Sequence, residues 1–175
     1  MLTLNVFFSW QSKTDKNRNW YFIREAIQRA LKTLKNSSAP ELYNVAFEYQ
    51  ESTSGESGMP DIVQTVDNRI ANCDIYIADL SIISEHLDPE PPIANNVLAE
   101  FGEAKAYVGL NHIIGVANNE YGSYKQDPKK LPFDIDHDKA PIEYTPEDGK
   151  DALAKQLVTA IKLCVKTAIL KRKTR

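Results

Sequence analysis

The residue of this sequence best placed to do chemistry is Glu100. It lies one turn inside a predicted helix whose expected N-cap is Asn95 or Asn96, where the positive end of the helix dipole favours an ionised carboxylate. At 100° per residue, Glu100 lies about 60° from the apolar stripe of that helix, at the border between core and cleft. A carboxylate there can stabilise positive charge on a substrate. The alternative is a surface glutamate on the flank of a helix.

Polar and aromatic side chains follow two of the predicted strands. Ser9, Trp10 and Gln11 come directly after the first strand, and Asp79 ends the third. In open parallel sheets, ligands bind beyond the carboxyl ends of the strands, where the strand order reverses. An apolar ring just past a strand end is exposed to solvent unless another group stacks on it. Trp10 is therefore a candidate for stacking on a ligand.

Other local patterns define no site. Residues 86–88 and 134–138 place His and Asp close together, but both runs lie in long predicted loops and are typical of solvated loop charge. Residues 55–58 lack the spacing of a dinucleotide-binding or phosphate-binding loop. No GxSxG motif is present, and neither cysteine neighbours a histidine. We predict no metal site.

The composition is that of an ordinary globular protein. Among its 175 residues, 21 Lys and Arg oppose 24 Asp and Glu, for a net charge of −3. Nucleic-acid binding normally requires a basic excess, so we expect none. No apolar run approaches the roughly 18 residues of a membrane helix, so we expect no membrane association. Cys73 and Cys164 are typical of core thiols in a reducing compartment, which favours the cytoplasm.

Strand-like and helical patterns alternate along the chain. The predicted strands are 4–9, 43–48, 74–79, 112–117 and 140–144, and the helical patterns are 17–35, 60–70, 96–108 and from about 150 onward. This alternation predicts an α/β protein with a five-stranded parallel sheet, helices on both faces and the flavodoxin-like order 2-1-3-4-5. The fifth strand is expected at an edge because Pro141 cannot donate to a ladder.

The length fits one domain, since domains usually have roughly 100–200 residues. We expect residues 1–170 to form it. The basic run 171–175 is expected to be a helix end, a tail or a linker.

Four motifs, in order along the chain, resemble those of bacterial TIR domains. They are Phe7-Phe8-Ser9-Trp10-Gln11, the run 53–62 (TSGESGMPDI), Ile77-Ala78-Asp79-Leu80 and the run 95–104 (NNVLAEFGEA). The similarity covers about residues 4–144 and is strongest to the TIR effectors of cyclic-nucleotide-triggered antiphage systems. Residues 132–134 and 141–144 resemble the closing segment of that subgroup. The resemblance implies the TIR version of the flavodoxin-like fold.

The resemblance implies cleavage of NAD+ at the nicotinamide–ribose bond. Glu100 matches the family's catalytic glutamate, and Phe8, Ser9 and Trp10 match its ring-stacking and ribose-contacting residues. We add three substrate-binding candidates from their predicted positions near the same edge of the sheet: Gln11, Asp79 and Asn96. Nicotinamide leaves as a neutral molecule, so one carboxylate suffices where ordinary glycosidases need two. NAD+ is then a substrate, and no cofactor is expected.

The resemblance also implies partners. TIR domains of this kind act after self-assembly with other TIR domains, and a sensor domain or a partner protein supplies the trigger. Residues 50–60 correspond to the family's mobile loop, which joins neighbouring subunits.

Three alternatives stay open at this point. The chain could be a cyclase that makes a cyclic ADP-ribose signal, or a non-catalytic adaptor between TIR domains. It could also be a nucleoside 2-deoxyribosyltransferase, because the run 96–102 (NVLAEFG) resembles that fold-sharing class as well. Animal and plant TIR domains carry Trp four residues before the glutamate, where this chain has Asn96.

Overall fold

A five-stranded, all-parallel sheet forms the centre of the protein. It is seen in a computed structural model that describes residues 1–51, 61–83, 92–131 and 140–173. The strand order is β2-β1-β3-β4-β5, so the predicted order and the edge position of β5 are confirmed. The strands are β1 (Leu2–Ser9), β2 (Val45–Glu51), β3 (Ile75–Asp79), β4 (Ile113–Asn118) and β5 (Ile142–Tyr144).

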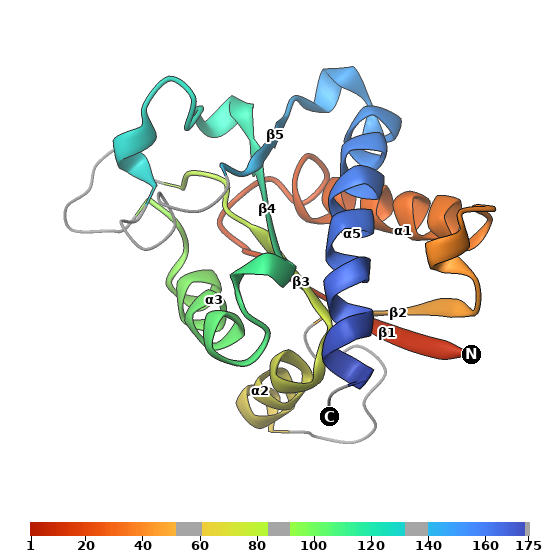
Figure 1. The fold of residues 1–175 in the computed structure, drawn as a ribbon. Helices are drawn as coiled ribbons and strands as arrows, with labels where there is room; N and C mark the ends of the chain where they lie inside the picture. The colour runs from red at the N-terminus through yellow and green to blue at the C-terminus, as the bar shows by residue number, and fades with distance from the viewer. Residues whose placement is uncertain (52–60, 84–91, 132–139, 174–175) are drawn as a thin grey trace.

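Helices cover both faces of this sheet. Figure 1 shows α1 and α5 on one side and α2 and α3 on the other. The helices are α1 (Trp20–Lys35), α2 (Ile62–Asn72), α3 (Asn95–Tyr107) and α5 (Lys150–Lys173). Short 3-10 turns connect some of these elements: η1 (Pro40–Leu42), η2 (Leu110–His112), η3 (Asn119–Tyr121), η4 (Pro128–Lys130) and η5 (Pro146–Asp148).

The sheet separates two hydrophobic cores. The core beneath α1 and α5 contains Phe8 and Ile27, and the core beneath α2 and α3 contains Phe7, Tyr76 and Phe101. Successive residues of a strand point to opposite faces, so Phe7 and Phe8 belong to different cores. All five residues of β3 are buried, as expected for a central parallel strand. The end of β1 is thereby held rigidly between the two layers.

The predicted boundaries differ from the observed ones in several places. Helix α1 begins at Trp20 rather than at residue 17, and Trp20 itself is half-buried. Ile62 opens α2 but is 60% exposed, because the buried side of that helix is formed by Val66 and Ile70. Helix α5 continues to Lys173, so the basic run 171–175 begins as a helix end, which is one of the three alternatives expected for it.

Two expectations from composition can be compared with the structure. Cys73 and Cys164 are both buried and form no disulfide in the described part of the chain, as predicted for core thiols. No helix in the described ranges is long and apolar enough to cross a membrane. The patterns singled out at 55–58, 86–88 and 134–138, most of the loop 50–60 and the motif residues 132–134 lie outside the described residues.

Candidate functional site

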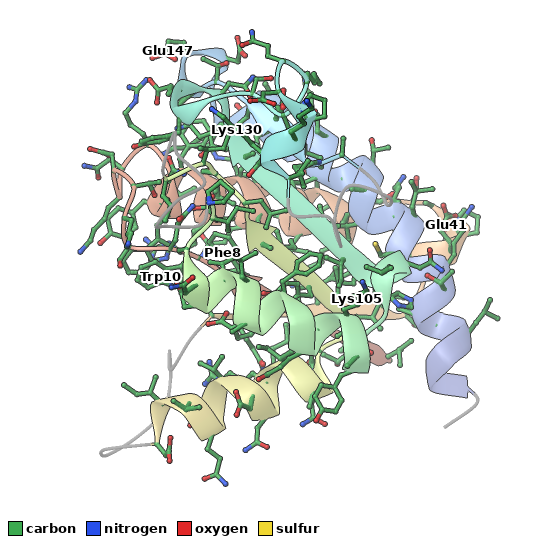
Figure 2. All side chains as sticks on the ribbon, turned by 90° about the vertical axis from the view of Figure 1, so that its left-hand side faces the viewer. Phe8, Trp10, Glu41, Lys105, Lys130 and Glu147 are labelled. Atoms are coloured by element: carbon green, nitrogen blue, oxygen red, sulfur yellow. The ribbon has the colours of Figure 1, made fainter. Side chains whose placement is uncertain are left out.

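A cleft opens where β1 ends beside the start of α3. It encloses about 440 Å³ including its open mouth and is lined by Phe7, Phe8, Ser9, Trp10, Ser12, Asn96 and Glu100. Figure 2 shows Trp10 next to the end of α3 that lies far from Lys105. Since β1 and β3 are neighbours and their crossovers diverge to opposite faces, the cleft lies at the switch point of the sheet. The structure therefore brings together five of the seven predicted site residues.

Glu100 is half-buried on the wall that α3 contributes. Val97, Phe101 and Ala104 face the core, which confirms the predicted stripe and leaves Glu100 at its border. Burial raises the pKa of the Glu100 carboxyl, the nearby charge of Glu103 adds to the rise, and Ser9 and Asn96 oppose it. The carboxyl group is thus harder to ionise than a fully solvated glutamate.

The start of α3 differs from the prediction. Its N-cap is Ala94, which makes no side-chain capping bond, and Asn95 and Asn96 are its first two residues. Glu100 is therefore the sixth helical residue, beyond the first turn, where the helix dipole has little effect. Burial and neighbouring side chains, rather than the helix dipole, shift the pKa of this carboxyl group.

Asn96 connects the two walls of the cleft. Its side-chain nitrogen donates to the backbone oxygen of Trp10 over 3.1 Å, and its side chain also lies close enough to stabilise ionised Glu100. Asn96 stands one helical turn before Glu100, so both side chains lie on the same side of α3. One residue thus ties the end of β1 to the catalytic candidate.

Trp10 is part of a stack of aromatic rings. Its ring lies 3.8 Å from that of Trp20 with an interplanar angle of 5°, and Tyr21 continues the stack at 4.6 Å. Trp20 is anchored because its indole nitrogen donates to Glu51 over 3.0 Å. What stacks on Trp10 within the protein is Trp20, a contact that the sequence did not indicate. This leaves the opposite ring face for a ligand in the cleft.

Phe8 belongs to the cleft lining, but its side chain is not exposed there as ring stacking on a ligand would require. Its side chain is fully buried in the core beneath α1 and α5. Its ring therefore belongs to the fold, and among the predicted aromatic residues Trp10 is the one available for ring stacking.

Gln11 and Asp79 do not line this cleft. Asp79 is fully buried and accepts hydrogen bonds from Ser81 and from the side chain of Asn19, while Gln11 donates to the Ser81 backbone oxygen over 2.8 Å. Asn118 joins the same cluster by donating to Asn19 over 2.9 Å. These residues connect the ends of β1, β3 and β4 to the start of α1.

Sequence reasoning missed several residues at the site. Ser12 follows Trp10 by two positions and lines the cleft, so a wider window after β1 would have included it. Trp20 and Tyr76 lie in patterns that are indistinguishable from core residues in the sequence. Their relation to the cleft follows from the packing of β1 against its neighbours.

Comparisons with known proteins bear on the fold. No model of a known protein family matches the sequence, and no curated protein matches it. A metal-soaked flavodiiron core from Synechocystis sp. PCC6803 has a similar structure, with a TM-score of 0.51 and 11% sequence identity over 99% of this chain. This chain spans 37% of the length of that protein. The likeness supports the flavodoxin-like α/β fold.

A second solved structure is less similar. It is a CMP N-glycosidase from Clostridium botulinum, with a TM-score of 0.43 and 18% identity, covering 87% of this chain and 97% of that one. The resemblance to TIR domains stays a prediction from the sequence motifs.

Proposed function

We propose that this protein hydrolyses NAD+ at the bond between nicotinamide and ribose, with Glu100 as its catalytic residue. The observation that carries the proposal is the cleft itself. It combines a half-buried carboxylate on α3 with an aromatic ring and a hydroxyl group at the end of β1. The TIR-like motifs that contain these residues support NAD+ as the substrate.

The reaction requires few catalytic groups from the protein. When the bond between C1 of the ribose and the pyridinium nitrogen breaks, its electron pair stays on nitrogen and neutralises nicotinamide. The ribosyl group is left with positive charge at C1. Water adds to C1 and loses a proton, which gives ADP-ribose. An ionised Glu100 beside the sugar stabilises the developing positive charge, and its oxygens can accept hydrogen bonds from the ribose hydroxyls.

The other cleft residues position the substrate. Trp10, held on one face by Trp20, offers its other face to a flat ring. Asn96 holds the backbone of Trp10 in place from α3. Following the resemblance, we assign the protein to antiphage immunity as an effector that acts with other TIR domains and a sensor.

Replacement of Glu100 tests the proposal. Concentrated protein is incubated with NAD+, and the products are identified by chromatography. We expect nicotinamide and ADP-ribose from the wild type and a loss of at least about 100-fold in turnover for Glu100→Gln. A matched control is Glu103→Gln, one turn further along α3 and outside the cleft lining. It removes a charge that disfavours ionised Glu100, so turnover should be retained or rise.

The products also separate the alternatives. A cyclic isomer of ADP-ribose would identify a cyclase with the same site. Transfer of a deoxyribosyl group from a deoxynucleoside to a free base would identify a deoxyribosyltransferase. Full turnover by Glu100→Gln would remove Glu100 from the mechanism.

A further inference from the structure

Two buried hydroxyl groups beneath the cleft make no well-formed hydrogen bond in the described part of the chain. Tyr76 is fully buried and Ser9 is 1% exposed, and each side-chain oxygen lacks a described partner at good hydrogen-bond geometry. Ser9 lines the cleft beside Glu100. Tyr76 pairs with Phe7 across β1 and β3, and therefore points to the same face of the sheet as Ser9.

The ring of Tyr76 packs between aromatic residues of β1 and α3. It is stacked on Phe7 with centroids 6.0 Å apart and meets Phe101 edge-on at 6.4 Å. Phe101 directly follows Glu100 on α3, so the phenol lies between the end of β1 and the carboxyl-bearing part of the helix. Ser9 is close enough to influence both the phenol and the Glu100 carboxyl.

A buried hydroxyl group without a partner destabilises a folded protein. Phenylalanine would fill the same space between two aromatic rings without that penalty. Ser9 lines the cleft together with Glu100, and Tyr76 lies close enough for the charge of Glu100 to raise the pKa of its phenol. Their position therefore points to a role at the site rather than in the fold.

We propose that Tyr76 is a positioning residue for Glu100 and acts through Ser9, an inference that rests on the proposed role of Glu100. In the substrate-filled cleft, the Tyr76 hydroxyl donates to Ser9 Oγ, and Ser9 donates to the Glu100 carboxylate. The direction follows from the donor inventory, because a carboxylate can only accept and serine has one proton to give. The chain of hydroxyl groups fixes which oxygen of Glu100 faces the sugar.

Other ionisable groups face the same place. Glu103 on α3 and Asp67 on α2 oppose ionisation of Glu100, and Cys73 at the end of α2 lies near Tyr76. Against this acidic background, Ser9 and Asn96 favour the ionised form of Glu100. Loss of the Tyr76 hydroxyl should free Ser9 to rotate and so raise the pKa of Glu100.

The test combines a direct titration with kinetics. The pKa of Glu100 is measured by carbon-13 NMR of labelled glutamate, and kcat is measured against pH. For Tyr76→Phe we expect the pKa of Glu100 and the acidic limb of kcat to move upward by about half a unit. We also expect kcat at neutral pH to fall roughly fivefold with KM nearly unchanged. Ser9→Ala should shift the titration in the same direction, and the double variant should shift it no further than Ser9→Ala alone.

Tyr124→Phe is the matched control. Tyr124 is also buried, but its hydroxyl donates to the backbone oxygen of Leu80 over 2.6 Å. This control should lose stability and keep the wild-type titration, whereas Tyr76→Phe should keep its stability because it loses no existing bond. If Tyr76→Phe does not fold, Ser9→Ala alone carries the test.

The results separate this inference from the proposed function. An unchanged titration of Glu100 in Tyr76→Phe, or in Ser9→Ala if that variant alone can be measured, would overturn the role of Tyr76, whatever the activity. Full turnover by Glu100→Gln would instead overturn the proposed function and, with it, the need for a positioned carboxylate. The NMR titration does not depend on turnover, so the two failures cannot be confused.

Discussion

Glu100 occupies a position where function and stability oppose each other. Burial raises the pKa of its carboxyl group, so folding makes ionisation less favourable than it is in the unfolded chain. Stabilisation of a positive ribosyl group requires the ionised form. Ser9 and Asn96 favour ionisation, which the site needs at neutral pH.

This opposition predicts how the stability of Glu100→Gln depends on pH. A raised folded-state pKa stabilises the wild type fully below the ordinary glutamate pKa, and that stabilisation is lost as the pH rises through the folded value. Glutamine does not titrate. The free energy of unfolding of the variant should therefore exceed that of the wild type at pH 7, and the difference should shrink near pH 4. Urea denaturation at both pH values measures it; a constant difference would contradict the account.

Trp10 is predicted to hold the substrate rather than to do chemistry. Trp10→Ala removes the ring that lines the cleft and uncovers one face of Trp20. We expect KM for NAD+ to rise about tenfold, and stability to fall by about 1 kcal/mol through the lost stack. Trp10→Phe keeps a ring and should be milder in both respects. Unchanged kinetics in Trp10→Ala would show that Trp10 contributes to packing and not to substrate binding.

At the scale of elements, a buried polar cluster holds the segment that follows β1 in place. Asp79, Ser81, Asn19 and Asn118 join the ends of β3 and β4 to the start of α1. Gln11 adds the segment after β1 to this cluster. The cluster positions the cleft residues although it does not line the cleft.

Asp79→Ala tests whether this cluster supports the fold. The change leaves buried donors of Ser81 and Asn19 without their acceptor. We expect the free energy of unfolding to fall by about 2–3 kcal/mol, with a smaller loss for Asp79→Asn, which keeps one acceptor oxygen. Chemical denaturation measures both variants. Normal stability together with a raised KM would instead place Asp79 in direct contact with the substrate.

Local patterns predicted the elements well but not the direction of every side chain. The stripe of α3 located Glu100 because helical spacing alone determines which residues flank a buried face. The rule that ligands bind beyond the carboxyl ends of parallel strands identified Trp10 and Ser9. The same rule also selected Asp79, whose side chain is fully buried. Whether a strand-end residue faces a cleft or a neighbouring loop depends on tertiary contacts that no local pattern contains.

At the scale of the whole molecule, the strand order could be predicted from the alternation of elements. Right-handed crossovers leave few possible arrangements, and the observed order β2-β1-β3-β4-β5 is one of them. The contact between Trp10 and Trp20 could not be predicted, because it needs the end of β1 and the start of α1 to meet in space. The same holds for Tyr76, whose pattern is that of any core residue.

Self-assembly is the prediction that belongs to the whole molecule. Following the TIR resemblance, we expect turnover per molecule to rise with protein concentration. Specific activity measured over a 100-fold dilution series (about 0.1 to 10 μM, near the range where weak associations form), with sedimentation in parallel, tests this. A specific activity that stays constant while the protein remains monomeric would contradict it.

The central claim is that the Glu100 carboxylate stabilises the sugar as nicotinamide leaves. The most direct measurement is the chromatographic release of nicotinamide from NAD+ by wild-type, Glu100→Gln and Glu103→Gln proteins at one high concentration. The account predicts release by the wild type and by Glu103→Gln and almost none by Glu100→Gln. Equal release by all three proteins would contradict it.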